Sequence, residues 1–117
     1  AIRYTIGGVA NYTLTGSNNV TTNTWYCLTW VLDGNNMKLY KNGSQIANTS
    51  ISTTRKPVCA NDCKLVVGMI VENNGSISGS SSRARSQVLG EIRIYDNNLT
   101  AAQVLSNYNA RSSRYGL

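Results

Sequence analysis

Residues 24–43 read TWYCLTWVLDGNNMKLYKNG, and this stretch decides the fold class. Residues 25–32 are rich in aromatic and β-branched residues, which suit a pleated, buried strand. The turn formers of 33–36 separate them from residues 37–41, in which Met and Leu alternate with Lys and Tyr. Asn42-Gly43 follows, a pair typical of a type I′ turn into another strand. The stretch therefore predicts a β-hairpin with a third strand after it.

The first arm of this hairpin is apolar on both of its faces. Its side chains alternate between Trp25, Cys27 and Val31 on one face and Tyr26, Leu28, Trp30 and Leu32 on the other. Such a strand is either covered on both sides or exposes one face to a ligand or a partner. Coverage on both sides, with both tryptophans and Cys27 in the core, is the simpler expectation.

Further strands are expected on both sides of the hairpin. Residues 1–14 predict two short strands joined at Gly7-Gly8, and residues 44–52 predict a third. The apolar run KLVVGMIV at 64–71 and the alternating residues 88–95 predict two more. Residues 72–87, rich in Gly, Ser and Asn, predict an exposed loop between them.

One helix is expected, near the C-terminus. Thr100 has the character of an N-cap, and Gln103 three residues later completes a capping box. Leu99 and Val104 are placed to form a hydrophobic staple across the cap. The helix is expected to end near Ala110, with residues 111–117 as a tail.

Length and charge limit the class of protein. The chain has 117 residues, enough for one domain, and a net charge of +6 from eleven Lys and Arg against five Asp and Glu. The charge favours weak attraction to polyanions, but the basic residues are scattered and no nucleic-acid motif accompanies them. No apolar run approaches the roughly 20 residues of a membrane helix. Because residue 1 is Ala, we expect a processed chain or a fragment.

Three cysteines suggest at most one disulfide. Cys59 and Cys63 are spaced to close a small loop, which would indicate an oxidising compartment. A zinc site needs four ligands, and the chain has no His and only one other cysteine, so no zinc site is expected.

Several segments together resemble laminin-G-like domains. WYCLTW at 25–30, DG at 33–34 and KLYKNG at 38–43 resemble the family's central hairpin. LVVG at 65–68 resembles its next short strand, and LGEIRIYD followed by LTAAQV at 99–104 is similar to its last strand and capped helix. The closing residues 107–117 resemble the C-terminus of such domains in virus and phage structural proteins.

This resemblance implies an all-β, concanavalin A-like fold. The fold is an antiparallel β-sandwich in jelly-roll order, here with one short C-terminal helix. The likeness covers roughly residues 24–117, so we expect a single laminin-G-like domain over 1–117 that lacks its usual first strands, as the C-terminal part of a longer protein. One departure is that Gly90 is followed by Glu91-Ile92-Arg93, without the Asp common at this point in the family.

Catalysis and metal binding are not expected. The fold hosts enzymes as well as binding proteins, but glycoside hydrolysis needs two carboxylates beside the bond. The five acids are scattered, and none forms the Glu-x-Asp-x-Glu strand of the glucanases with this fold. Calcium needs six or more oxygen ligands, so we expect no cofactor, with a calcium site built from turn carbonyls as the disfavoured alternative.

Glycan binding by the hairpin is the alternative to tryptophans buried in the core. An aromatic face with amide partners suits a sugar, and the candidate residues are Tyr26, Trp30, Asn35, Asn36 and Tyr40. Arg83 and Arg85 in the loop would favour acidic glycans. Among the Asn-x-Ser/Thr sequons, Asn19 and Asn74 lie in polar loops and are the candidate glycosylation sites.

The expected protein is therefore a non-enzymatic adhesion or assembly module of a virion or cell-surface protein. Its expected partners are glycans or other surface chains, within an oligomer and without specific nucleic acid. Two alternatives remain: a purely structural virion subunit buried against partner chains, and an accessory part of a glycan-degrading enzyme.

Overall fold

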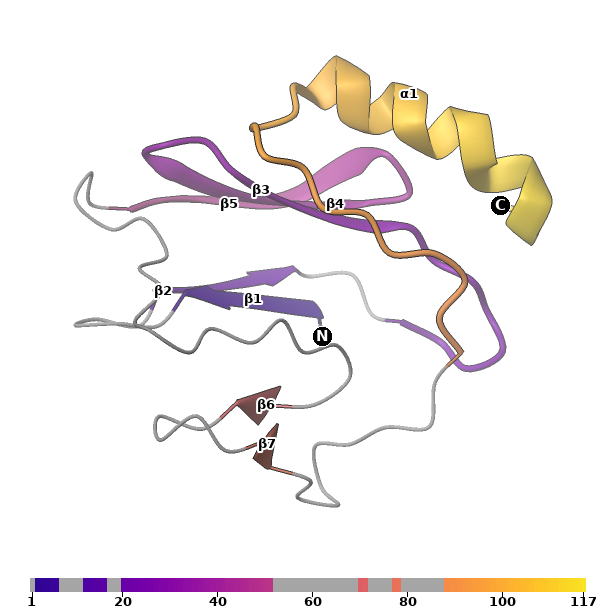
Figure 1. Cartoon of the computed structure of the whole chain (residues 1–117), viewed down its shortest axis with the longest axis horizontal. Coiled ribbons are helices and arrows are strands. Elements are labelled where there is room, and N and C mark those ends of the chain that lie inside the picture. Colours follow the sequence, from indigo (N-terminus) through magenta and orange to yellow (C-terminus); the bar gives the residue numbers. More distant parts are fainter. Residues whose placement is uncertain (1, 7–11, 17–19, 52–69, 72–76, 79–87) are drawn as a thin grey trace. The chain divides into compact units, whose positions relative to one another are not determined.

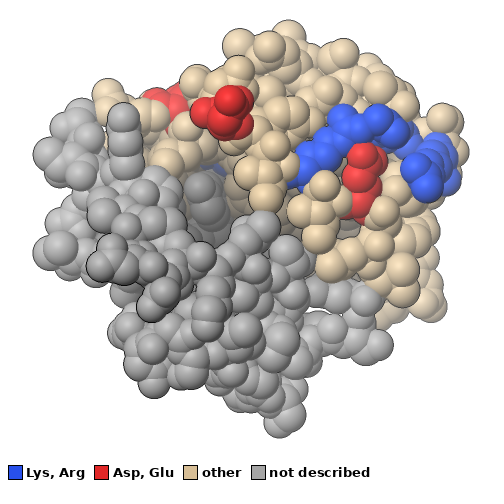
Figure 2. Space-filling view, in the orientation of Figure 1, with Lys and Arg blue, Asp and Glu red and all other residues tan. Residues whose placement is uncertain are grey.

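The structure is a computed structural model that describes residues 2–6, 12–16, 20–51, 70–71, 77–78 and 88–117 (Figure 1, Figure 2). The chain divides into two compact units. Residues 1–57 and 95–117 form one unit, and residues 58–94 form the other.

A three-stranded antiparallel sheet forms the centre of the first unit. Its strands are β3 (Leu28–Leu32), β4 (Asn36–Lys41) and β5 (Ser44–Ser50), in the order β3-β4-β5. The predicted hairpin and the strand after it are confirmed, although β3 begins at Leu28 and not at residue 25.

The turn between β4 and β5 has the conformation that its sequence predicts. Asn42 and Gly43 both have positive φ, at 50° and 78°, as a type I′ turn requires. The Asn42 amide donates to the Cys27 carbonyl at 2.8 Å, and the Asn42 Oδ1 accepts from the Cys27 amide at 2.9 Å. The side chain of Asn42 thus continues the ladder one pair beyond the end of β3.

The sheet buries apolar side chains on both faces. One cluster holds Met37, Leu39 and Ile51, with Leu28, Leu32, Ile46 and Ala47 packed around them. The other holds Val31, Tyr40 and Val104, with Leu99 beside them. Coverage of both faces was expected from the apolar first arm, and the second cluster shows that the C-terminal helix covers one of them (Figure 1).

The expectation that both tryptophans belong to the core is wrong. Trp30 is 45% exposed and Trp25 is 39% exposed. β3 is an outer strand of the three-stranded sheet, and Trp25 precedes it, so neither ring is enclosed from both sides. Cys27, also expected in the core, is a free thiol that is only half-buried.

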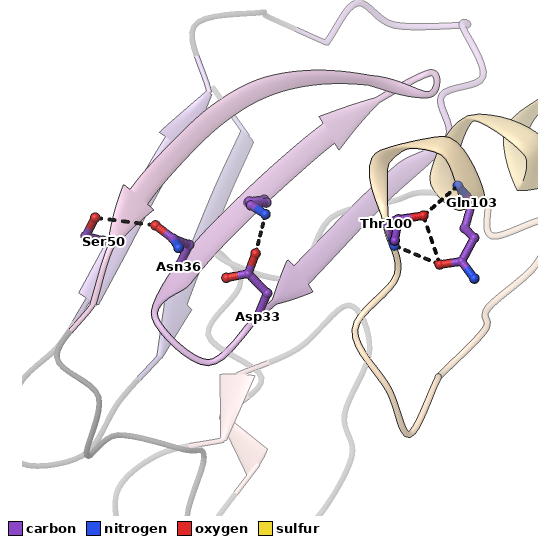
Figure 3. Close-up of polar contacts among 6 residues, drawn as sticks. Asp33, Asn36, Ser50, Thr100 and Gln103 are labelled. Carbon is purple, nitrogen blue, oxygen red and sulfur yellow. Dashed lines mark hydrogen bonds and ion pairs between the residues drawn. The ribbon is translucent and has the colours of Figure 1, made fainter.

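Helix α1 (Ala101–Ser112) begins where its cap predicts. The Gln103 amide donates to Thr100 Oγ1 at 3.2 Å, and the Thr100 amide donates to Gln103 Oε1 at 2.8 Å (Figure 3). Leu99 and Val104 share one cluster, as a staple requires.

The end of the helix differs from the prediction. α1 continues to Ser112, and a 3₁₀ turn, η1 (Ser113–Tyr115), follows it. Residues 111–117 are therefore not an irregular tail. No residue of this segment breaks the helical path until Gly116, which ends it with a φ of 66°.

The remaining strands are short. β1 (Ile2–Ile6) pairs with β2 (Tyr12–Gly16) in antiparallel register, which confirms the two strands predicted in 1–14; the Gly7-Gly8 turn lies outside the described residues. In the second unit β6 (Ile70–Val71) pairs with β7 (Ile77–Ser78). β7 falls in the segment predicted as a loop, so that prediction is wrong at these two residues.

The strand predicted at 88–95 is not observed. These residues are all described, and none is in a strand. Val88 is 78% exposed and Ile94 is 70% exposed. Alternation of apolar and polar side chains marks a face, but a strand also needs a hydrogen-bonded neighbour. The described residues provide no such neighbour to this segment.

The described elements are consistent with a concanavalin A-like domain, with an antiparallel sheet and one C-terminal helix. The complete two-sheet jelly roll remains a prediction. Within the described ranges, no helix is long and apolar enough to cross a bilayer.

Candidate functional site

The candidate glycan-binding residues do not form a single site. Asn35 and Asn36 lie at the turn between β3 and β4, whereas Tyr26 lies beyond the other end of this hairpin. Tyr40 is 2% exposed and packs with Val31 and Val104 under α1. It is therefore a core residue, on the face of the sheet opposite to Trp30. Arg83, Arg85, Cys59, Cys63, Asn19 and Asn74 lie outside the described residues.

The turn at 33–36 is held by its own polar groups. The Asp33 amide donates to the Asn36 carbonyl at 3.0 Å, and the Asn35 amide donates to the Asp33 carbonyl at 2.7 Å. Asn36 Oδ1 accepts from the Ser50 hydroxyl at 3.4 Å (Figure 3). Asn36 thus ties the turn to β5, while Asn35 is exposed to solvent.

The Asp33 carboxylate forms an ion pair with Lys38, drawn in Figure 3. The hydrogen bond from Lys38 holds the pKa of the Asp33 carboxyl below its ordinary value, and the same bond raises the pKa of Lys38. Asp33 is therefore ionised at neutral pH. A carboxylate in this state can accept hydrogen bonds but cannot act as a general acid.

Tyr26 lies in a group of hydroxyls at the other end of the hairpin. Its hydroxyl lies 2.7 Å from Thr21 Oγ1 and accepts a hydrogen bond from the Thr21 amide at 3.1 Å. Thr24 Oγ1 lies 3.1 Å from Thr21 Oγ1. The hydrogen bonds from the Thr21 side chain and backbone lower the pKa of the Tyr26 phenol. Lys41 Nζ lies 4.3 Å from the centre of the Tyr26 ring.

Tyr26 and Trp30 share one face of the first arm. Directly opposed residues of an antiparallel pair point to the same side, and Leu28 opposes Lys41 while Trp30 opposes Leu39. Tyr26 precedes β3, but Lys41, which opposes Leu28, lies over its ring, so Tyr26 is on the side of Leu28 and Trp30. We call Tyr26, Lys41 and Trp30 the Trp30 face.

Sequence reasoning missed a second aromatic group, formed by Trp25 and Tyr115. The rings of Trp25 and Tyr115 lie 5.2 Å apart between centroids and are tilted by 48°. The Arg114 guanidinium lies 5.7 Å from the centre of the Tyr115 ring. Residues 25 and 115 are distant in the sequence and belong to no shared motif, so no local pattern could have joined them.

Basic side chains form a band on the face of the molecule shown in Figure 2, and acidic side chains lie at scattered points. The helical segment 101–117 contains Arg111 and Arg114 and no Asp or Glu. In the part of the chain with described side chains, no three His, Cys, Asp or Glu residues gather as a metal site would require.

Comparison with protein families identifies this architecture. The family model described as the concanavalin A-like lectin/glucanases superfamily matches residues 1–105. The chain belongs to this superfamily. The superfamily match includes the first 23 residues, in which the sequence motifs gave no sign of it.

A solved structure has a similar fold. It is the crystal structure of an S-layer domain-containing protein (residues 221–444) from Clostridium thermocellum ATCC 27405, with a TM-score of 0.59 and 19% sequence identity. The similarity covers 87% of this chain and 47% of that one, so this chain spans about half the length of the S-layer structure. A comparison with curated protein sequences finds no significant match.

Proposed function

We propose that this chain is a non-enzymatic adhesion or assembly module of a surface protein, and that it binds glycans through the Trp30 face. Its superfamily is named for lectins and glucanases, which supports a carbohydrate ligand. The similar solved structure is named as an S-layer domain-containing protein, which supports a cell-surface location.

The observation that carries the proposal is the combination of groups on the Trp30 face. A pyranose has an apolar C–H face and a rim of hydroxyls, so its binding site combines aromatic rings with polar partners. Trp30 supplies a large ring that is 45% exposed. Tyr26 supplies a second ring, with the hydroxyls of Thr21 and Thr24 and the ammonium of Lys41 around it.

The separation of these two rings favours an oligosaccharide over a single sugar. Tyr26 and Trp30 are four residues apart, about 13 Å in an extended chain, which is too far for one pyranose to contact both rings. The exposed amide of Asn35, at the turn beyond Trp30, provides a polar group for the end of a longer glycan. Arg83 and Arg85 remain predicted contacts for acidic groups of such a ligand.

The state of two of the five acids, Asp33 and Glu91, supports binding without bond cleavage. A glycosidase needs one carboxyl with a raised pKa as the acid and a second as the nucleophile or base. Asp33 is paired with Lys38 and has a lowered pKa. Glu91 accepts a bond from Arg93 at 2.6 Å. Both carboxylates are thus occupied by cations in ways that do not suit a general acid.

A glycan array followed by calorimetry tests this function. We expect the wild-type chain to bind an oligosaccharide, and Trp30→Ala and Tyr26→Ala to weaken the binding by about tenfold or more. Tyr95→Ala is the matched control, because Tyr95 is an exposed aromatic residue (41%) bonded to Asn107 and away from the Trp30 face. Folded Trp30→Ala and Tyr26→Ala variants with wild-type affinity would contradict the proposal, as would release of reducing sugar from the bound glycan.

An assembly role is favoured by a different observation. The segment 88–95 carries exposed apolar side chains: Val88, Leu89, Ile92 and Ile94 are all more than half exposed. Apolar side chains grouped in this way often mark contacts between protein chains. Sedimentation over a range of concentrations separates the two roles, since a monomer that binds glycan needs no partner chain, whereas an assembly module associates in the absence of glycan.

A further inference from the structure

We infer that Trp25, Tyr115 and Arg114 form a second glycan site, which selects sugars that carry a carboxylate. This site, the Trp25 site, does not depend on the Trp30 face. The two sites use different partners, because Trp25 contacts Tyr115 in the 3₁₀ turn after α1 whereas Tyr26 contacts Lys41 of β4.

The three side chains form a continuous row. Each step is shorter than 6 Å, from the Trp25 ring to the Tyr115 ring and from the Tyr115 ring to the Arg114 guanidinium. An acidic pyranose has the matching shape, with an apolar ring face and a carboxylate attached to the ring carbon framework. The ring would stack on the aromatic pair while the carboxylate meets the guanidinium.

The exposure of Trp25 and Arg114 indicates a binding surface beside Tyr115, which is half-buried with its hydroxyl enclosed. Trp25 remains 39% exposed although its ring already packs on Tyr115, and Arg114 is exposed. The indole therefore has apolar area available to a ligand, and burying apolar area is favourable.

Arg114 decides the chemical class of the ligand. A guanidinium presents a planar fork of donors that fits a carboxylate with two parallel bonds, and its contact with the Tyr115 ring restricts its position before binding. Asp and Glu are absent from residues 101–117, so no acid of this segment competes for it. A neutral sugar would use the rings but would leave the guanidinium without an anionic partner.

The test uses a galacturonic acid tetrasaccharide and its methyl-esterified form, in which each carboxylate is replaced by a neutral methyl ester. We expect the wild-type chain to bind the acid form at least about tenfold more tightly than the ester. Arg114→Gln should remove this preference and leave the ester affinity within about twofold. Arg111→Gln is the matched control, because it removes the same charge from the same exposed segment, outside the row.

The variants also separate this site from the Trp30 face. Trp30→Ala should leave the preference for the acid form unchanged, whereas Trp25→Ala should weaken the binding of both the acid form and the ester. Arg114→Gln keeps the Trp25–Tyr115 ring pair in place. Its effect on the preference can therefore be interpreted even if Trp25→Ala disturbs the fold. Equal losses of the preference in Arg114→Gln and Arg111→Gln would show general charge attraction and overturn the inference. A wild-type chain without preference for the acid form would also overturn it.

Discussion

Gly43, in the turn between β4 and β5, lies directly against Leu105 of α1. A Cβ placed on Gly43 would be 2.8 Å from Leu105 Cδ1 and 3.0 Å from Tyr108 Cδ1. The residue that the type I′ turn requires for its positive φ is thus also the residue that lets the helix approach the sheet. One glycine joins the two local motifs of the chain, the hairpin turn and the capped helix.

Gly43→Ala is expected to destabilise the fold by about 2–4 kcal/mol. About 1–2 kcal/mol comes from the positive φ, and the remainder from the overlap with Leu105 and Tyr108. Gly34→Ala is the control, since Gly34 has a similar φ of 69° with no atom within 4 Å of its Cβ position. Urea unfolding measures both variants. Equal losses of unfolding free energy in Gly43→Ala and Gly34→Ala would show that the helix does not pack on Gly43.

Thr100→Ala is expected to cost about 1 kcal/mol, because the Gln103 amide loses its acceptor at the start of α1. Thr100→Ser keeps the hydroxyl and should retain most of the stability. The denaturation midpoint of each variant tests this cap. A Thr100→Ala chain as stable as the wild type would contradict the role assigned to the capping box.

The Asp33–Lys38 ion pair should make stability depend on pH at the acid end. The pKa of folded Asp33 lies below its unfolded value near 3.9, so the contribution is complete above that value and disappears as the pH falls through the folded pKa. Because both side chains are partly exposed, the contribution at pH 7 should be at most about 1 kcal/mol. The stability difference between wild type and Lys38→Met should shrink from pH 6 to pH 2; a constant difference would argue against the pair.

Tyr115→Phe is expected to leave stability unchanged or to raise it by up to about 1 kcal/mol. The Tyr115 hydroxyl is buried and has no hydrogen-bond partner among the described residues, so its removal relieves an unpaired polar group. Tyr26→Phe, which loses the bonds to Thr21, should lower stability instead. Thermal unfolding of the two variants checks the contrast, and a destabilised Tyr115→Phe chain would reveal a partner for that hydroxyl.

Features set by neighbouring residues could be predicted from the sequence. Asn42-Gly43 specifies its turn through the φ angles of two residues, and Thr100 with Gln103 specifies the helix start within one turn. Both predictions are confirmed because each motif satisfies its own hydrogen bonds, wherever the rest of the chain lies.

Features set by distant partners could not be predicted. The segment 88–95 has the side-chain pattern of a strand, but a strand exists only with a hydrogen-bonded neighbour. Tyr40 and Trp30 are both aromatic residues in predicted strands, yet Tyr40 is buried under α1 and Trp30 is exposed. The difference arises because only the tertiary fold determines which face of the sheet the helix covers.

The contact between Trp25 and Tyr115 shows the same limit at the candidate site. Tyr115 becomes a neighbour of the hairpin only because the helix continues through Ser112 into η1. The prediction of a tail after Ala110 removed that residue from consideration. An error of a few residues at a helix end therefore concealed a complete aromatic pair.

The chain contains two tryptophans, so their two indole N–H signals report on the two proposed surfaces separately. The most direct test of glycan binding is a titration of the ¹⁵N-labelled chain with a neutral oligosaccharide selected on the array, with the signals assigned by Trp25→Phe and Trp30→Phe. We predict that the Trp30 indole signal shifts in a saturable way. Indole signals that stay in place at saturating concentrations of every oligosaccharide tested would contradict the proposal that this chain binds glycans through the Trp30 face.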